Sequence, residues 1–164
     1  FRFSYDVPAQ GALAGQVSVR YSAAIYNRWD YDAQSGKYLR FADTQDDFEQ
    51  GKNEVYAQLT DRLTGEPISA DNLVVMYVTH QYYSRRPEIV DIVMSGPGKV
   101  YLFRDGQMFE LTWYRNALDE LFILVDKDGK LFPLKPGNTW FEIVGTSTKA
   151  ANEGSNWRFV FQIP

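Results

Sequence analysis

Hydrophobic and polar residues alternate with a period of two along most of the chain. Gly, Pro, Asn or Asp interrupts the alternation at intervals of roughly 10 to 15 residues. The alternation is clearest at Val17 and Val19, and at Trp157 and Phe159 near the C-terminus. A period of two places every second side chain on the same face of an extended strand, so these segments are predicted to be strands with one buried face.

A helical period occurs in one short segment, residues 54–63. There Val55, Leu59 and Leu63 recur at positions i, i+4 and i+8. The segment is barely three turns long, so helix and strand remain equally supported. The polar, acidic residues 43–52 before it are predicted to be a solvent-exposed loop.

Turn residues predict several hairpins. Asp105-Gly106 tolerates the positive φ of a type I′ turn, so residues 100–104 and 108–114 are predicted to pair. Two further hairpins are predicted, formed by residues 27–32 with 37–41 and by residues 122–125 with 130–134. The run 73–78 and, apart from Asp91, the run 89–94 are apolar without alternation, which predicts strands buried on both faces.

Together these patterns predict an all-β, mainly antiparallel fold. We expect a sandwich or partly closed barrel of about 10 to 11 short strands, with at most one or two short helices. The chain has 164 residues, enough to bury a core, and shows no internal repeat or linker. It is therefore predicted to form one domain, residues 1–164.

Composition narrows the possible chemistry. The chain has no Cys and a single His, His80, which excludes disulfides, cysteine nucleophiles and metal sites that need two imidazoles. The net charge is −4 and the 17 basic side chains are scattered apart from Arg85-Arg86, so no nucleic-acid partner is expected. No apolar run reaches the ~18 residues of a membrane helix, so membrane attachment is expected only through a lipid anchor outside this sequence.

Two acidic segments have some features of metal sites. Asp126 and Asp128 have the spacing of a calcium loop, but Gly129 comes too early and position 137 is Gly instead of an acidic ligand. A hairpin turn is the favoured interpretation. Acidic residues of the segment 43–52 could offer oxygen ligands, but a solvated loop is favoured there. We therefore expect no metal and no cofactor.

Several motifs occur in a characteristic order. They are Trp29-Asp30-Tyr31-Asp32, Gly36-Lys37-Tyr38-Leu39-Arg40, Asp61, Thr64-Gly65, Ala70-Asp71-Asn72-Leu73-Val74-Val75, Gly96-Pro97-Gly98-Lys99-Val100, Phe103-Arg104-Asp105-Gly106, Thr112-Trp113, Asp128-Gly129-Lys130 and Pro136-Gly137-Asn138-Thr139-Trp140. Over residues 16–144 this collinear set resembles the C-terminal domain of the YerB-like bacterial lipoproteins.

The resemblance implies a secreted, lipid-anchored bacterial envelope protein, in which a separate N-terminal domain precedes this one and is a partner for it. The family has no established activity, so the resemblance implies no catalytic residues. Family members often carry a histidine two residues before the position of Asp61, whereas this chain has Leu59. Any chemistry that used that histidine would be lost here.

Two groups of residues are candidates for a binding site. Arg40, Asp61 and Asn72 are polar residues at the ends of predicted strands, where a buried arginine–carboxylate pair with an amide is either structural or a ligand site. Tyr82, Tyr83 and Arg85 are predicted to lie in a loop, where aromatic and cationic side chains can contact a polymer or protein. His80 is interpreted as a strand-end residue bonded to backbone.

Three functions remain open. The leading hypothesis is a non-catalytic module that binds a cell-wall polymer or an envelope protein. A carboxylate-based or metal-assisted hydrolase would require Asp61, Arg40 and a further acid in one pocket. A purely structural domain would dock against the N-terminal domain and would expose a large apolar patch.

Overall fold

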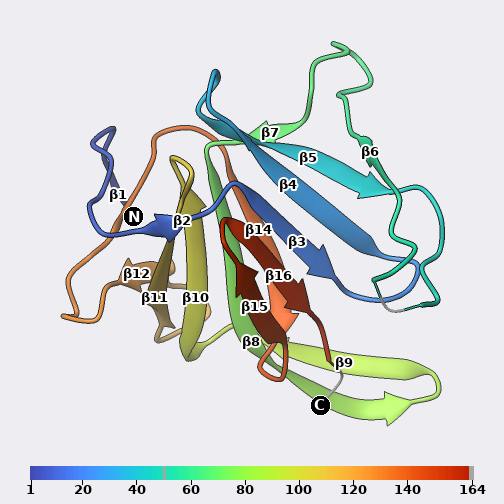
Figure 1. Ribbon diagram of the computed structural model, residues 1–164. Helices are drawn as coiled ribbons and strands as arrows, with labels where there is room; N and C mark the ends of the chain where they lie inside the picture. Colours follow the sequence, from blue (N-terminus) through green and yellow to red (C-terminus); the bar gives the residue numbers. More distant parts are fainter. Residues whose placement is uncertain (50, 163–164) are drawn as a thin grey trace.

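The computed structural model describes residues 1–49 and 51–162, and every helix or strand assigned in this part of the chain is a β-strand (Figure 1). The strands are β1 (Arg2–Phe3), β2 (Ala12–Leu13), β3 (Gln16–Arg20), β4 (Tyr26–Asp32), β5 (Lys37–Asp43), β6 (Tyr56–Gln58), β7 (Ser69–Ala70), β8 (Asn72–Arg85), β9 (Glu88–Val93), β10 (Gly96–Arg104), β11 (Gln107–Arg115), β12 (Ile123–Val125), β13 (Pro133–Leu134), β14 (Thr139–Gly145), β15 (Lys149–Glu153) and β16 (Asn156–Val160). The predicted all-β class is confirmed.

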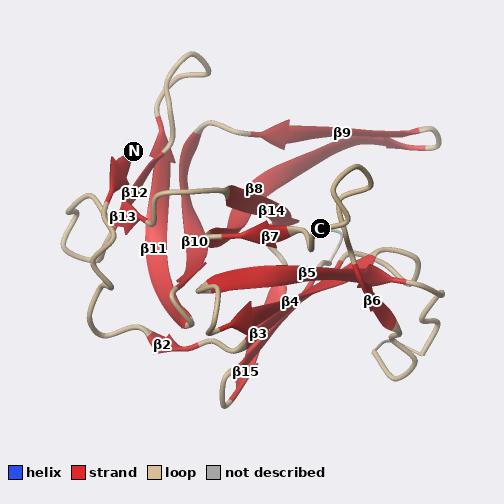
Figure 2. Cartoon of the chain, turned by 90° about the horizontal axis from the view of Figure 1, so that it is seen from above, coloured by secondary structure: helices blue, strands red, loops and turns tan. Residues whose placement is uncertain are grey.

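The strands form two large sheets. The first has the order β12-β11-β10-β8-β14, with β2 added to β11 and β9 added to β8. The second has the order β15-β16-β3-β4-β5-β6, with β7 added to β5. The short strands β1 and β13 form a separate two-stranded parallel sheet. Most neighbours in the two large sheets are antiparallel, but β14 runs parallel to β8 and β16 runs parallel to β3. The sheets form an open sandwich and do not close into a barrel (Figure 2).

The main core lies between the two sheets. Leu73, Val75 and Tyr77 of β8 point into it, and Val17 and Phe159 of the second sheet meet them there. Each of these side chains is at most 7 % exposed. Because burial of one such side chain stabilises the fold by about 1.5–3 kcal/mol, this interface holds the two sheets together.

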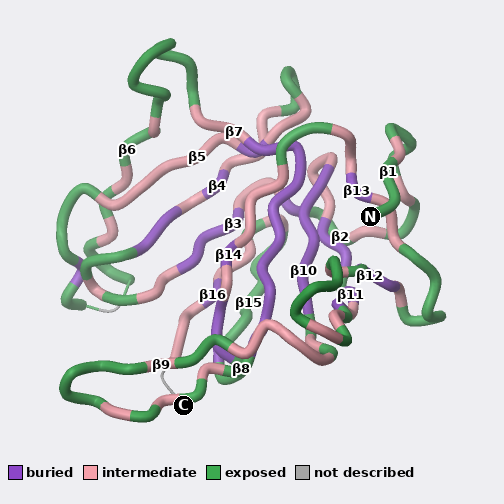
Figure 3. The backbone as a smooth tube through the Cα atoms, turned by 180° about the vertical axis from the view of Figure 1, so that it is seen from behind, coloured by how far each residue is buried: buried purple, intermediate pink, exposed green. Residues whose placement is uncertain are grey.

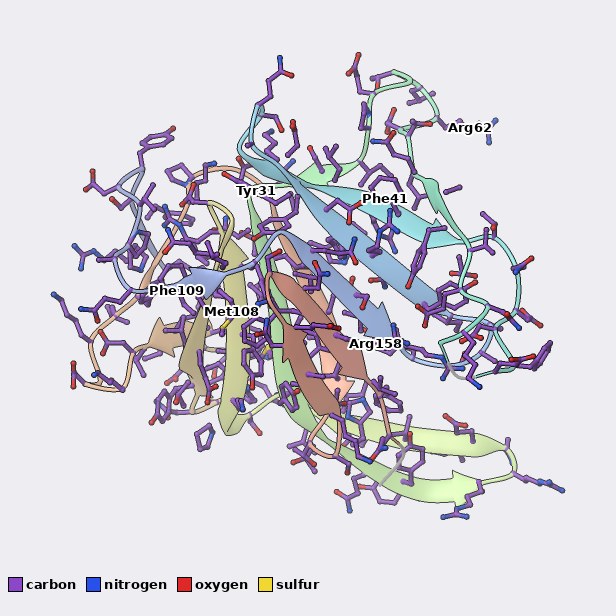
Figure 4. The ribbon with its side chains drawn as sticks, viewed as in Figure 1. Tyr31, Phe41, Arg62, Met108, Phe109 and Arg158 are labelled. Carbon is purple, nitrogen blue, oxygen red and sulfur yellow. The ribbon has the colours of Figure 1, made fainter. Side chains whose placement is uncertain are left out.

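A second core covers the opposite face of the first sheet. The alternate residues of β8, Val74, Met76 and Val78, belong to it. On β11 the neighbours Met108 and Phe109, labelled in Figure 4, belong to the first and the second core respectively. The prediction that residues 73–78 are buried on both faces is therefore confirmed.

One end of the sandwich is fixed by buried charges. Arg104 is fully buried, and its Nε lies 2.7 Å from Asp105 Oδ2, while one terminal nitrogen donates to the Ser4 carbonyl. Lys135 Nζ lies 3.2 Å from Asp105 Oδ1 and donates to the Gly36 carbonyl at 2.6 Å. The turn between β10 and β11 is thus tied to the turn between β4 and β5.

The three predicted hairpins are all present, although the third is short and irregular. Strand β4 pairs with β5, and β10 pairs with β11 around Asp105-Gly106, where φ is +53° and +69°. Residues 122–134 contain β12 and an isolated bridge between Val125 and Leu131. In the ambiguous segment 54–63 the structure has the short strand β6 and an isolated bridge from Thr60 to Pro67. Val55 and Leu63 are exposed there, so the stripe of helical period does not face the core.

Two predictions about the region after residue 78 are wrong. Tyr82 and Tyr83 lie in β8, which runs past the sandwich and pairs with β9 in a projecting hairpin. None of residues 89–94 is buried: each is exposed or half-buried, so the segment is not buried on both faces (Figure 3). The apolar run predicted a central strand, but no second layer covers β9, because β9 pairs with the part of β8 that lies beyond the core.

The described residues of the acidic segment 43–52 are mostly exposed, as predicted, but Asp47 is an exception. Asp47 is fully buried and accepts hydrogen bonds from the backbone N–H groups of Gly51 and Asn53. Its carboxylate also lies 3.3 Å from Arg20 Nε. Asp47 is therefore held against β3 by Arg20, and Glu54 receives a bidentate contact from Arg158 of β16, labelled in Figure 4.

Candidate functional site

Arg40 lies in a cluster between the two sheets. Its guanidinium carbon is 4.3 Å from the ring centroid of Trp140 on β14 and 5.8 Å from that of Trp29 on β4. A cation over an aromatic face contributes about 0.5–2 kcal/mol, depending on desolvation. Arg40 Nε is buried without a hydrogen-bond partner among the described residues. Arg40 therefore contacts aromatic rings of both sheets.

The carboxylate of this cluster is Glu142, which is 4 % exposed. It accepts hydrogen bonds from Tyr21 Oη at 2.8 Å, Trp29 Nε1 at 3.0 Å and Asn27 Nδ2 at 3.3 Å. Burial, together with this carboxylate, raises the pKa of Tyr21, so the hydroxyl keeps its proton and donates. We call these residues the inter-sheet polar cluster: Tyr21, Asn27, Trp29, Arg40, Trp140 and Glu142.

Asn72 and Asp61 form their hydrogen bonds with residues outside this cluster. Asn72 is fully buried, donates to the Lys135 carbonyl and to Thr139 Oγ1, and accepts from the Lys135 N–H. Asp61 is exposed and its Oδ1 accepts three hydrogen bonds from Leu63 and Thr64. Those bonds lower the pKa of Asp61. Asp61 thus holds its own turn, whereas Asn72 connects the start of β8 to the segment that leads into β14.

The hydrolase hypothesis gains no support from this arrangement. Asp61 closes its own loop, whereas Arg40 contacts tryptophans between the sheets. Neither residue lines the cavity described below. Among residues 1–49 and 51–162, no three His, Asp or Glu side chains are grouped so that they could hold a metal ion.

Tyr82, Tyr83 and Arg85 lie on the projecting β8–β9 hairpin, near its tip. Tyr83 is 64 % exposed and Tyr82 is half-buried. The pairing shifts register between Tyr82 and Ser84, which marks a β-bulge. The N-terminal segment and the hairpin lie on opposite sides of the molecule (Figures 1 and 3). The hairpin therefore carries aromatic and cationic side chains away from the sandwich, as a binding surface would require.

A cavity of about 420 Å³ lies at the base of this hairpin. Small-molecule sites usually have volumes of about 300–1,000 Å³. Residues of β8, β10, β11 and the β14–β15 connection line it: Tyr77, Val78, Thr79, Val93, Ser95, Pro97, Gly98, Lys99, Tyr101, Trp113, Thr146, Thr148 and Ala150. The cavity and the hairpin share Thr79 and Val93, which pair with each other.

The cavity exists because one chain segment detaches from β8. Thr79 pairs with Val93, and Met76 pairs with Val100, so residues 94–99 stand opposite only two residues of β8. The longer segment must bulge away, which leaves space beside β8.

Trp113 fills the floor of the gap left by this bulge. Its indole Nε1 donates to the Tyr77 carbonyl at 2.9 Å, in place of a sheet hydrogen bond. A Cβ atom at Gly98 would collide with this indole and would lie 2.7 Å from the Tyr77 carbonyl oxygen. Glycine is therefore required at position 98 for the indole to lie under the strand.

The lining is rich in hydroxyl groups and carries one cation. Lys99 Nζ lies 4.5 Å from the ring centroid of Tyr101 and 3.4 Å from Glu110 Oε1. Burial alone would lower the pKa of Lys99, but Tyr101 and Glu110 outweigh it and raise the pKa, so the ammonium stays protonated. Thr148 is 7 % exposed, and its Oγ1 has no hydrogen-bond partner among the described residues.

Sequence reasoning missed the residues that define the inter-sheet polar cluster and the cavity. Glu142 lies between apolar residues of a strand. This pattern in the sequence indicates a buried acid. Lys99 and Thr148 carry no such signal, because the cavity depends on a change of strand register and on the contact of two distant chain segments.

The open β-sandwich and the ordered motifs place the chain in a family. Residues 17–141 match the family described as "Protein of unknown function (DUF3048) C-terminal domain", and the chain belongs to this family. Within the described residues, no helix is long and apolar enough to cross a membrane.

Two comparisons with YerB of Bacillus subtilis agree with this assignment. The chain is 34% identical over 85 residues to the protein named "Putative lipoprotein YerB" of strain 168, an alignment covering 52% of this chain and 24% of that protein. The crystal structure of YerB from Bacillus subtilis matches with a TM-score of 0.63 and 28% identity, over 82% of this chain and 42% of that chain. The chain thus spans less than half the length of the relative that it matches.

Proposed function

We propose that this domain is a non-catalytic binding module of an envelope lipoprotein, and that it binds a cell-wall polymer or an envelope protein through the β8–β9 hairpin and the cavity at its base. The observation that carries the proposal is the continuity between the exposed hairpin and the hydroxyl-lined cavity, which share Thr79 and Val93. The relative's name, putative lipoprotein, supports an extracytoplasmic, membrane-anchored location.

The cavity suits binding better than catalysis. Its lining contains hydroxyl, aromatic and aliphatic side chains and one lysine, but no carboxylate and no histidine. A hydroxyl nucleophile needs a neighbouring base, and hydrolysis of a glycosidic bond normally needs two carboxyl groups at a defined separation. The lining offers neither arrangement.

Retention on purified peptidoglycan and on isolated wall polymer tests the proposal. The double variant Tyr82→Ala, Tyr83→Ala should be retained several-fold less than the unaltered domain. Tyr5→Ala is a matched control, because Tyr5 is 79 % exposed on the N-terminal segment, away from the hairpin. Equal retention of the double variant and the control would remove the hairpin from the binding surface.

A second candidate function is docking against the N-terminal domain that the family name implies. The observation in its favour is a group of exposed apolar side chains in the N-terminal segment: Phe1, Phe3, Tyr5 and Val7 are between 47 and 79 % exposed. Exposed apolar groups of this kind mark contact surfaces. In the longer protein, Phe3→Ser with Val7→Ser should loosen the two domains, seen as an increased radius of gyration in X-ray scattering.

A further inference from the structure

We infer that the outer edge of β9 binds an extended, basic segment of another protein, which adds to the β8–β9 hairpin as a further strand. This site deepens the proposed function, on which it rests, by naming the chemistry of the partner. The backbone of the segment pairs with the edge of β9, and a lysine or arginine of the same segment contacts Asp91.

The outer edge of β9 has no strand beside it in residues 1–49 and 51–162. There β9 pairs with β8 alone, and none of the other backbone hydrogen bonds of this part of the chain involves residues 88–93. In a strand with a single neighbour, every second residue directs its N–H and C=O groups outward. Figure 1 shows that the hairpin extends beyond the two large sheets. The edge therefore offers unpaired backbone donors and acceptors to a partner.

The regular shape of β9 suits the addition of a strand. All six residues of β9 take part in the pairing with β8, and the extra residue of the bulge is Tyr83 on β8. A bulge bends its own strand and disrupts that edge, whereas the edge of β9 is continuous and contains no proline or lysine. A two-stranded hairpin is only marginally stable by itself, so a third strand would stabilise it.

The ligand that matches such an edge is a polypeptide backbone. Its N–H and C=O groups repeat with the same spacing as those of β9, and its side chains on alternate faces supply specificity. An added strand would also cover part of Ile89 and Ile92, which are 52 % and 41 % exposed. The partner segment should therefore carry apolar side chains at alternate positions.

Asp91 determines the charge of the partner. It is exposed, lies opposite Gln81 and belongs to none of the ion pairs of the described residues. Strand β9 carries a second acid, Glu88, and no basic residue. Two copies of the chain that paired through β9 would bring four carboxylates onto one edge, which is destabilising. A lysine or arginine opposite Asp91 makes the same carboxylate attractive, so the charge selects a basic partner over self-pairing.

NMR titration of the ¹⁵N-labelled domain with three capped hexapeptides tests this site. The first peptide alternates valine and lysine, the second alternates valine and glutamate, and the third is the first with every backbone nitrogen methylated. We expect the valine–lysine peptide to shift the amide resonances of residues 88–93 in a saturable way and to slow hydrogen exchange at alternate residues of β9. The glutamate peptide should bind at least tenfold more weakly, and the methylated peptide should not bind, because it has no N–H groups to donate.

Asp91→Asn separates the charge contact from the backbone pairing. The variant should bind the valine–lysine peptide about three- to tenfold more weakly, while its Tm should change by less than about 2 °C, because Asp91 is exposed. Asp128→Asn is the matched control: it removes one negative charge from an exposed turn outside the hairpin and should leave the affinity unchanged. Raising NaCl from about 0.05 to 0.5 M should weaken binding of the peptide to the unaltered domain more than to Asp91→Asn.

Four results would overturn the inference. They are no shift at residues 88–93, equal binding of the methylated peptide, equal affinities of Asp91→Asn and Asp128→Asn, or a concentration-dependent dimer whose β9 amides are protected, which would assign the edge to a second copy. If Tyr82→Ala, Tyr83→Ala lost retention on wall polymer while no peptide bound, the strand-addition site would be rejected and the wall-binding function kept. If the valine–lysine peptide protected β9 while wall material retained no domain, the site would stand and wall binding would be rejected.

Discussion

Replacing Glu142 by Leu tests whether the inter-sheet polar cluster is structural. Leucine fills a similar volume but accepts no hydrogen bond. Trp29 is 0 % exposed and Asn27 is 6 % exposed, so neither N–H group can turn to water when the carboxylate is removed. Each unpaired buried donor costs about 1–3 kcal/mol, which gives a loss of about 2–6 kcal/mol for the two. Removing a buried charge also removes its desolvation cost, which offsets part of the loss. We therefore expect the free energy of unfolding to fall by about 2–4 kcal/mol.

Urea unfolding followed by tryptophan fluorescence measures this loss. In a domain of this size 1 kcal/mol corresponds to about 2–4 °C in Tm, so thermal unfolding should shift by about 4–16 °C. Glu142→Gln is the matched control, since its amide oxygen still accepts from Trp29; its loss should be about 1 kcal/mol. If the Leu variant were as stable as the Gln variant, the cluster would not hold the sheets together, and Arg40 would return as a ligand-binding candidate.

Three further predictions concern other parts of the fold. Burial alone would raise the pKa of Asp47 and Glu54, but hydrogen bonds from backbone N–H groups, Arg20 and Arg158 lower them below their ordinary values of 3.8 and 4.5. Carboxyl groups with depressed pKa values stabilise the fold above pH 4.5, so the free energy of unfolding should fall as the pH drops below 4.5. Glu54→Gln should make the free energy of unfolding depend less on pH in this range. An unchanged pH dependence would show that Glu54 does not contribute to it. Gly98→Ala should lower the free energy of unfolding in urea by about 1–3 kcal/mol and shift the NMR resonance of the Trp113 indole N–H. An unchanged resonance would show that the indole is not tightly packed against residue 98. Asn72→Ala removes three hydrogen bonds of a fully buried side chain and should cost about 2–4 kcal/mol by calorimetry, and an unaltered Tm would refute its structural role.

The features that the sequence predicts correctly are those set by near neighbours in the chain. Asp105-Gly106 specifies its turn by backbone preference alone, and the hairpin of β10 and β11 follows from it. The continuous apolar run 73–78 specifies a strand between two cores, because both of its faces must be covered.

The errors concern features set by distant parts of the chain. Residues 73–78 and, apart from Asp91, residues 89–94 are apolar runs, yet only the first is covered on both faces. Whether a strand is covered depends on where its partner strand ends relative to the core, and β8 continues past the core to Arg85. Likewise Asp47 resembles an exposed acid until Arg20 and the backbone of Gly51 are brought to it.

The candidate residues show the same contrast. Asp61 accepts hydrogen bonds from Leu63 and Thr64 of its own turn, which is a local feature. Asn72 instead bonds to Lys135, a residue distant in the sequence. Arg40 lies in the inter-sheet polar cluster with Trp140 and Glu142, which belong to β14. No spacing rule within the sequence connects residues so far apart.

The motifs that link the chain to its family also separate structural from functional residues. Arg104, Asp105 and Asn72 each have bonds that account for their presence in the fold. In the motif of residues 96–100, Gly98 is explained by the indole beneath it. Lys99 forms a half-exposed pair with Glu110, worth at most about 1 kcal/mol, and a cation–π contact with Tyr101, worth about 0.5–1 kcal/mol at an exposed site. These contacts stabilise the fold only modestly, and the proposed binding at the cavity would give Lys99 a second role.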